Sequence, residues 1–342
     1  MLSRVADSIY WMNRYMERAE NVARFVDVNL HLMLDLPDPG ATQWDALVAT
    51  TGDHEYFKEH YGEAATQDAV LHFLTADTKY PSSILSCLTA ARENARSVRE
   101  AISSDMWEQV NRSFLQVREA VQNGTVTESP YEFFSQVRLA CHLFTGITHI
   151  TMSHNEAWHF GRMARLLERA DKTSRIVDVK YFLLLPDPSY VGSAYDEIQW
   201  AALLKSASAF EMYRKRYGRI TPPSVMEFLI LDDEFPRSIR FCVRKAERSL
   251  QAIVADRELV VNSASEQLAW LRSEIYADTI QEIIAGGVHQ YLDSVQTRLN
   301  DLGEAVHDTF FAHAPTMPPS IPAPARPKSS PPPVKPSQTS SQ

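Results

Sequence analysis

Two stretches far apart in the chain repeat one thirteen-residue pattern. Residues 16–28 read MERAENVARFVDV and residues 167–179 read LERADKTSRIVDV, with seven of the thirteen positions identical. Both consist of helix-favouring residues, and both lead to the same stop, LPDP, at residues 36–39 and 185–188. Because the copies keep charges as well as apolar residues, the pattern indicates a constraint beyond packing, at a surface or a site.

The duplication extends past this motif. The spacing FLxxDxxxPxSIxxC occupies residues 73–87 and recurs at residues 228–242, so the offset grows from 151 to 155, as small loop insertions would produce. No stretch shows sustained alternation of the strand type. The sequence therefore predicts an all-α fold, a helical bundle built from two diverged repeats of about 150 residues.

The predicted organisation is one helical domain at residues 1–313, with internal repeats at about 1–153 and 154–313, followed by a tail at 314–342. The tail is rich in Pro and Ser, and its only charges are Arg326, Lys328 and Lys335. Such a composition cannot bury enough apolar surface to order itself, so we expect disorder. A solvated tail and a docking peptide for a partner both stay open.

Helices are expected wherever apolar residues recur at helical period between capping and breaking residues. Two begin at serine caps, one at Ser82 or Ser83 and ending near residue 103, the other at Ser238. The remaining expected helices cover residues 2–35, 104–122, 130–152, 155–184, 195–217, 264–276 and 278–311.

Composition limits the class of protein. The chain has 342 residues, 44% of them apolar, and a net charge of -9, which repels phosphate backbones and argues against nucleic-acid binding. Its three cysteines lie far apart without C-x-x-C spacing, as in a reducing compartment. The N-terminus lacks the apolar centre of a signal peptide, and no run is long enough to span a bilayer. We expect a cytoplasmic protein that does not bind membranes.

A set of six charges recurs between the motif copies. On a solvated helix face, a pair such as Glu20 and Arg24 stabilises by only about 0.3–0.5 kcal/mol, too little to hold every charge in place. We favour a buried polar lattice between helices, and a binding site for a charged ligand or partner stays open; plain surface explains the repetition least. The set comprises Arg14, Glu17, Arg18, Glu20, Arg24 and Asp27, repeated as Arg165, Glu168, Arg169, Asp171, Arg175 and Asp178.

Residues 2–29, LSRVADSIYWMNRYMERAENVARFVDVN, and residues 155–181, NEAWHFGRMARLLERADKTSRIVDVKY, resemble the alpha-E domain family. These are bacterial all-helical proteins with a signature Glu-Arg pair, which here is Glu17-Arg18 and again Glu168-Arg169. The resemblance covers roughly residues 1–312 and leaves the tail outside.

The resemblance implies a set of partners. Alpha-E proteins accompany a circularly permuted ATP-grasp protein, to which some are fused, and a transglutaminase-like protein. This implies an accessory or substrate-handling protein in peptide or amide-bond formation or modification, without a cofactor. The two Glu-Arg pairs would organise a polar centre, and the guanidinium groups of Arg14, Arg24, Arg165 and Arg175 could hold a carboxylate of a substrate or of a partner.

An enzyme in its own right is the alternative. Glu17 and Glu168 could act as acid and base if burial raised the pKa of one of them. Glu156-x-x-His159 and Glu304-x-x-His307 have the spacing used by di-iron helical bundles. Such pairs are expected by chance in a chain with this many Glu and His, and the resemblance implies no metal, so these four are weak candidates. Phosphate-binding glycine loops and the G-x-S-x-G nucleophile motif are absent from the sequence.

Overall fold

The structure is a computed structural model that describes residues 1–35, 41–183, 194–257 and 262–312. Within these ranges the chain forms sixteen helices and no strand, so the all-α prediction is confirmed. Residues 1–312 make one compact unit. The division near residue 153 stays a prediction, and the predicted disordered tail at 314–342 lies outside the described residues.

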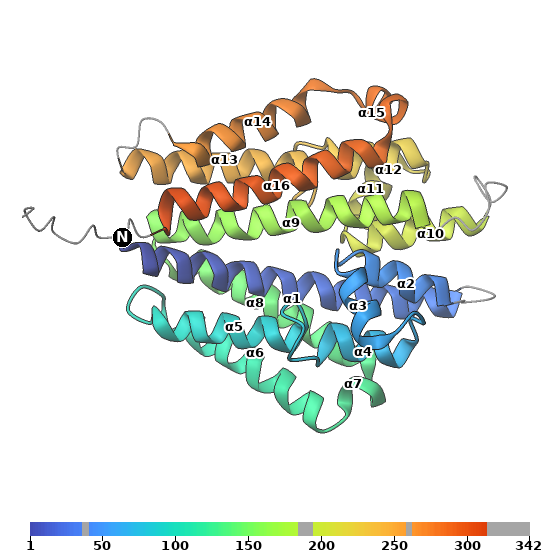
Figure 1. Cartoon of the computed structure of the whole chain (residues 1–342), viewed down its shortest axis with the longest axis horizontal. Coiled ribbons are helices and arrows are strands. Elements are labelled where there is room, and N and C mark those ends of the chain that lie inside the picture. Colours follow the sequence, from blue (N-terminus) through green and yellow to red (C-terminus); the bar gives the residue numbers. More distant parts are fainter. Residues whose placement is uncertain (36–40, 184–193, 258–261, 313–342) are drawn as a thin grey trace, which may run out of the picture. The chain divides into compact units, whose positions relative to one another are not determined.

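Two long helices form the centre of the compact unit. Helix α1 (Ser3–Asp35) and helix α9 (Glu156–Leu183) pack along each other (Figure 1). Both helices carry small, fully buried residues, among them Ala19 and Ala23 on α1 and Ala170 on α9. Small side chains let neighbouring helices approach closely.

Helix α1 packs on the first set of flanking helices. It contacts α5 (Ile84–Ser97) and α8 (Pro130–Thr151), and α6 (Ser104–Gln122) packs on both of these. In Figure 1 this set lies below the central pair.

Helix α9 packs on a second set in the same way. It contacts α13 (Ile239–Asp256) and α16 (Val288–Phe310), and α14 (Ser263–Ala277) packs on both. This set lies above the central pair in Figure 1. Each motif helix therefore packs on two later helices of the chain, and a third helix packs on the outside of those two.

Shorter helices connect these elements, and several were not expected from the sequence. Most are too short to show a clear helical period. They are α2 (Ala41–Ala49), α3 (His54–Tyr61), α4 (Gln67–Thr75), α7 (Thr125–Glu128), α10 (Ala194–Ser206), α11 (Phe210–Tyr217), α12 (Pro222–Ile230) and α15 (Ile280–Gly286).

Ser83 and Ser238 cap equivalent helices. The Ser83 hydroxyl accepts a hydrogen bond from the backbone N–H of Ser86 at 3.1 Å, and Ser238 accepts one from Phe241 at 3.1 Å. Of the two serines that could begin α5, Ser83 is therefore the cap. Ser82 is left for another partner, described below.

The predicted boundaries of three helices were wrong. The helix over 195–217 is interrupted between α10 and α11, where Ser208 has a φ of +50° that no regular helix accommodates. The helix over 278–311 is broken at Gly287, whose φ is +103°. The helix expected to reach residue 103 ends at Ser97, because Ser103 caps α6 and the chain turns before it.

The three cysteines are buried free thiols. Burial raises the pKa of Cys87 and of Cys242 to about 12, which keeps both thiols protonated and unreactive at neutral pH. Both act as small apolar core residues.

Among the described helices, none combines the length and apolarity required to cross a membrane.

Candidate functional site

Each motif glutamate is bound by the arginine of the other central helix. Arg169 donates from Nε and Nη2 to Oε1 and Oε2 of Glu17 at 2.7 and 2.9 Å. Arg18 donates from the same atoms to Oε1 and Oε2 of Glu168 at 2.7 and 3.0 Å. These are two-bond guanidinium–carboxylate pairs, the strongest geometry for such contacts. The Glu and Arg that adjoin in sequence thus exchange partners across the α1–α9 interface.

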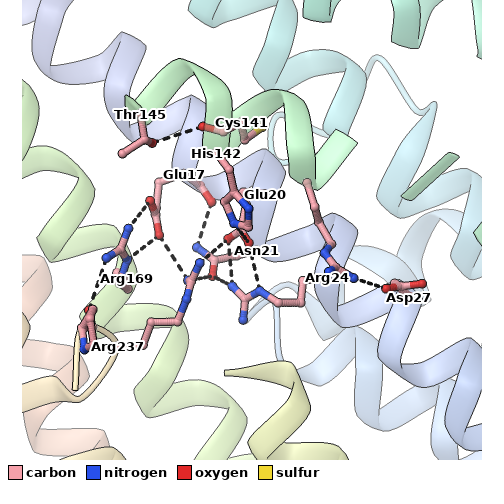
Figure 2. A network of polar contacts seen from close by, with 12 residues as sticks. Glu17, Glu20, Asn21, Arg24, Asp27, Cys141, His142, Thr145, Arg169 and Arg237 are labelled. Carbon is pink, nitrogen blue, oxygen red and sulfur yellow. Dashed lines mark hydrogen bonds and ion pairs between the residues drawn. The ribbon is translucent and has the colours of Figure 1, made fainter. Parts of the chain in front are cut away.

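Around Glu17 lies what we call the Glu17 cluster: Glu17, Glu20, Asn21, Arg24, Arg169 and Arg237 (Figure 2). Arg237 precedes α13 and donates to Glu17 at 3.3 Å, to Asn21 at 3.2 Å and to Glu20 at 2.9 Å. Arg24 donates to both carboxylate oxygens of Glu20, at 3.0 and 2.9 Å. The cluster therefore neutralises two carboxylates with three guanidinium groups.

Around Glu168 lies the Glu168 cluster: Glu168, Asp171, Lys172, Arg175, Arg14 and Arg18. Arg14 donates from Nε to Glu168 at 2.9 Å. Nζ of Lys172 lies 3.1 Å from Asp171 and 4.0 Å from Glu168. Arg175 donates to Asp171 at 3.0 Å, and Arg18 also donates to the Ser82 hydroxyl at 3.3 Å.

The carboxylates of both clusters stay ionised. Burial alone would raise the pKa of Glu168, but Arg18 and Arg14 outweigh burial and hold it well below its ordinary value. For Glu17, burial is outweighed in the same way by Arg169 and the pKa is lowered. The pKa values of Glu20 and Asp171 are also lowered, because nearby cations again outweigh burial. A carboxyl group with a lowered pKa is poorly suited to act as a general acid near neutral pH.

The two clusters together with Arg165 contain more cations than carboxylates. Burial lowers the pKa of Arg165 to about 10, and burial together with neighbouring Arg24 lowers that of Arg237 to about 10. In the described part of the chain, eight basic side chains surround four acidic ones, and all twelve are buried or nearly so. The basic residues are Arg14, Arg18, Arg24, Arg165, Arg169, Lys172, Arg175 and Arg237; the acidic ones are Glu17, Glu20, Glu168 and Asp171.

The last recurring acids lie beside the clusters. Asp27 pairs with Arg138 of α8, and Asp178 pairs with Nδ1 of His289 on α16 at 2.7 Å. Arg165, by contrast, donates to the side chain of Asn13. The structure thus brings the recurring charges together around the α1–α9 interface, with Asp27 and Asp178 binding the flanking helices.

Arg14 and Arg18 also line an open pocket of about 650 Å³ between α1 and α16. Arg14 donates to the Tyr10 hydroxyl at 3.2 Å, and its guanidinium carbon lies 5.5 Å from the Trp11 ring centre. Among the described residues, none accepts a hydrogen bond from Nη2 of Arg14. The volume is typical of a small-molecule site. The other lining residues include Phe311, Asn300, Glu304 and His307.

A smaller cavity of about 170 Å³ adjoins the Glu17 cluster on the side of α8. Its lining includes Cys141, His142 and Thr145, which Figure 2 shows above the two glutamates. Nε2 of His142 lies 3.1 Å from Oε1 of Glu20. This cavity leads to carboxylate oxygens that are already hydrogen-bonded.

The weak metal candidates fall in two places. Glu156 is bound by Arg257 and by the amino group of Met1, and burial lowers the pKa of His159. Glu304 and His307 both line the pocket beside Arg14. Within residues 1–35, 41–183, 194–257 and 262–312, no three His, Cys, Asp or Glu side chains are grouped to hold a metal ion. The described residues therefore offer no di-iron ligand set.

Comparison with known proteins identifies the class. Residues 1–311 match the alpha-E family, described as a predicted alpha-helical domain with a conserved ER motif. The chain belongs to this family, and Glu17-Arg18 and Glu168-Arg169 are the Glu-Arg pairs that stand at matching places in the repeated motif.

Curated relatives are uncharacterized proteins of Mycobacterium bovis and of two strains of Mycobacterium tuberculosis. Each is 22% identical over 335 residues, which cover 90% of this chain and 37% of the relative. The chain therefore spans little more than a third of the length of these relatives. No solved structure matches.

Proposed function

We propose that this alpha-E protein is a substrate-handling protein that binds a peptide carboxylate at Arg14 and Arg18 without catalysing a reaction itself. One observation carries the proposal: Arg14 and Arg18, which share Glu168 as their counterion, both line a pocket of ligand size. Nη2 of Arg14 has no acceptor among the described residues, so a carboxylate in the pocket would accept a charge-assisted hydrogen bond there.

The pocket suits one end of a peptide. Arg14 is held by Glu168 through Nε, which leaves Nη2 for a carboxylate. Trp11 and Phe311 offer apolar contact for a side chain, and Glu304 of α16 offers an acceptor for an amino or amide group. Among the four arginines proposed from the sequence to hold a carboxylate, Arg14 is the one that lines this pocket.

The proposed partners are an ATP-grasp ligase-like protein and a transglutaminase-like protein, on the basis of the family resemblance. Amide-bond formation starts from a carboxylate and an amine, so a protein that holds a peptide carboxylate suits such a system. The greater length of the mycobacterial relatives is consistent with an alpha-E domain that works beside other domains.

The chain offers less support for catalysis by Glu17 and Glu168. Both carboxylates are bound by guanidinium groups through both oxygens, and both pKa values are lowered. An acid–base pair requires one carboxyl group whose pKa lies near the working pH. We therefore assign the lattice a structural and positioning role.

Two diverged repeats are the proposed origin of the lattice. The proposal is supported by the repeated motif, by the reciprocal Glu–Arg pairs and by the like arrangement of the flanking helices around α1 and α9.

Binding of small peptides tests the proposed function. Calorimetry of the full chain with a tripeptide bearing a free C-terminal carboxylate is expected to show binding, and the same peptide as a C-terminal amide is expected to bind at least about tenfold more weakly. Arg14→Gln is expected to abolish the difference between the two peptides. The matched control is Arg96→Gln, whose side chain is 66% exposed on α5.

Equal binding of the acid and the amide, or an unchanged preference in Arg14→Gln, would overturn the carboxylate site. The partner assignment is tested separately, by titrating the purified ATP-grasp-like protein against the chain. Arg169→Ala is the reference variant, because a purely structural lattice would lower its melting temperature without changing the partner affinity of the folded fraction.

A further inference from the structure

Helices α9 and α13 pack along each other, and hydrogen bonds join them near both ends. At the start of α13, the backbone carbonyl of Arg237 accepts a hydrogen bond from the Thr173 hydroxyl of α9 at 2.9 Å. Directly after α13, Arg257 binds Glu156, the first residue of α9. The two helices therefore run in opposite directions, and the first half of α9 lies along the second half of α13.

Three cations gather where these halves meet, and we call them the basic seam: Arg162 of α9 with Lys245 and Arg248 of α13. Within the described part of the chain, none of the three has an ion pair or a side-chain hydrogen bond. Burial and Arg248 lower the pKa of Arg162, and burial, Arg248 and two further arginines lower that of Lys245. The three charges therefore lie close enough to repel one another. Arg244 is not included, because it is bound by Asp233.

The two acidic residues of α13 do not neutralise the basic seam. Glu247 is bound by Arg272 of α14 at 3.0 Å. Asp256 lies about two helical turns beyond Arg248. Residues 157–167 of α9 contain no Asp or Glu. The basic seam therefore keeps its positive charge, in a chain whose net charge is -9.

The equivalent helix pair, α1 and α5, carries no cation at the positions of the basic seam. At an offset of 151 for the motif helices and 155 for the serine-capped helices, these positions are filled by Trp11, Ala90 and Glu93. Glu93 is bound by Arg96 at 2.6 Å. The same place is thus basic on one helix pair and apolar or acidic on the other, so the fold itself does not require the three cations.

Aromatic rings flank the basic seam. The guanidinium carbon of Arg162 lies 5.1 Å from the Trp158 ring centre, and Nζ of Lys245 lies 5.3 Å from the Phe241 ring centre. Such contacts hold the cationic groups in place without cancelling their charge. Phe241 is only half-buried, so it offers apolar contact to a partner beside the cations.

The charge and the placement of the basic seam select the partner. A group of cations without counterions attracts anions. Its residues stand on two helices and line neither of the cavities described above, so they suit several carboxylates on one chain segment better than one small anion. The net charge of -9 repels a nucleic acid, whose phosphate backbone would continue beyond the seam.

We propose that the basic seam binds an acidic segment of a partner protein, whose carboxylates pair with Arg162, Lys245 and Arg248. The inference goes beyond the carboxylate pocket, because none of these three residues lines that pocket.

The test uses the full chain and two fluorescent synthetic peptides with blocked ends, so that neither carries a terminal carboxylate. One has several Glu among apolar residues, and the other has Gln at the same positions. At low ionic strength the Glu peptide is expected to bind at least about tenfold more tightly than the Gln peptide. Arg248→Glu, which introduces the residue type found on α5, is expected to abolish this difference. Its melting temperature is expected to stay equal or rise, because the new carboxylate gives Arg162 and Lys245 a counterion.

Arg118→Glu on α6 is the matched control. Arg118 also lies over an aromatic ring, at 5.2 Å from the Phe114 ring centre, and has no acidic partner among the described residues. This variant makes the same change of charge and is expected to leave the preference for the Glu peptide unchanged.

Four results would overturn the proposal: equal affinity for the two peptides, an unchanged preference in Arg248→Glu, a lower melting temperature of that variant, or tighter binding of a single-stranded oligonucleotide than of the Glu peptide. Arg14→Gln separates this surface from the carboxylate pocket. It is expected to leave the affinity for the Glu peptide unchanged, and Arg248→Glu is expected to leave binding of the free-carboxylate tripeptide unchanged.

Discussion

The Glu17 cluster and the Glu168 cluster have the same reciprocal Glu–Arg pair but obtain a further cation from different places. In the Glu17 cluster the motif helix carries Asn21, and the cation is Arg237 from the turn before α13. In the Glu168 cluster the motif helix carries Lys172 at the position of Asn21, and Ser82 stands at the position of Arg237. The two substitutions compensate, so each cluster retains the same number of positive charges at these two positions.

The difference shows that the charge of each cluster is maintained more strictly than the identity of its residues. A buried carboxylate without a cation is costly, and an extra buried cation is costly too. A change from Asn to Lys on the helix is tolerated where the facing turn carries Ser, and Arg in that turn is tolerated where the helix carries Asn. Residues that differ between the copies therefore carry as much of the site as residues that agree.

The largest expected effect comes from removing a motif carboxylate. Glu168→Ala leaves Arg14, Arg18 and Lys172 without their shared anion and is expected to cost about 3–5 kcal/mol in the free energy of unfolding. Glu17→Ala is expected to cost less, because Arg237 and Arg24 keep Glu20 as a counterion. Urea unfolding of both variants measures the difference. Equal losses, or a loss near 1 kcal/mol, would contradict burial of the clusters.

The pH dependence of stability is expected to differ between the two clusters, with a smaller effect than removal of a carboxylate. The pKa values of the cluster carboxyls are lowered in the fold, so their stabilisation is fully present above the unfolded value of about 4.3 and is lost as pH falls through the lowered values. Glu168 accepts a third hydrogen bond from Arg14 at 2.9 Å, whereas the third contact of Glu17, from Arg237, is longer at 3.3 Å. Below about pH 4.3, the free energy of unfolding is therefore expected to decrease less steeply with falling pH in Glu168→Gln than in Glu17→Gln. Parallel acid titrations of the two variants by circular dichroism would show this order, and the reverse order would contradict it.

Giving the Glu17 cluster the residues of the Glu168 cluster tests whether the Asn-to-Lys and Arg-to-Ser differences compensate for each other. Asn21→Lys alone adds a buried cation beside Arg237, and Arg237→Ser alone leaves Glu20 with one guanidinium fewer. Each is expected to destabilise, and the double variant is expected to recover about 1–3 kcal/mol relative to the sum of the two. Chemical denaturation of the four proteins gives the coupling. Simple additivity would show that the two positions act independently.

The smallest expected difference in stability is between alanine substitutions at two glycines. A Cβ at Gly161 of α9 would lie 2.6 Å from Nδ2 of Asn13, the residue that binds Arg165, whereas a Cβ at Gly146 of α8 would meet nothing within 4 Å. Gly161→Ala is expected to cost about 1–3 kcal/mol through overpacking. Gly146→Ala is expected to stabilise by up to about 1 kcal/mol through helix propensity. Melting temperatures that shift in the same direction would contradict this assignment of close contact at Gly161.

The sequence sufficed for the helical class and for the long helices. Apolar period locates α1, α6, α8 and α9 to within a few residues, because long helices average over local exceptions, and the serine caps locate the starts of α5 and α13. The breaks at Ser208 and Gly287 were missed, since each depends on the backbone conformation of single residues. Short helices such as α3 and α12 were missed because they contain too few turns for a period to emerge.

The candidate site was predicted only in part. The recurring charges pointed to Glu17, Arg18, Glu168 and Arg169, but sequence adjacency gives no sign that the partners are exchanged. Arg237 and Lys172 were missed because a search for agreement between the copies passes over positions that differ. A comparison of charge at the differing positions would have found both. The pocket beside Arg14 depends on α16, whose contact with α1 is tertiary.

A double-mutant cycle tests the central claim of exchanged Glu–Arg pairs most directly. Unfolding free energies of wild type, Glu17→Gln, Arg169→Gln and the double variant give the coupling between residues on different helices. The parallel cycle uses Glu17→Gln and Arg18→Gln, which adjoin in sequence. The structure predicts a coupling of about 2 kcal/mol for Glu17 with Arg169 and below about 0.5 kcal/mol for Glu17 with Arg18. Strong coupling within the adjoining pair and none across the helices would contradict the account.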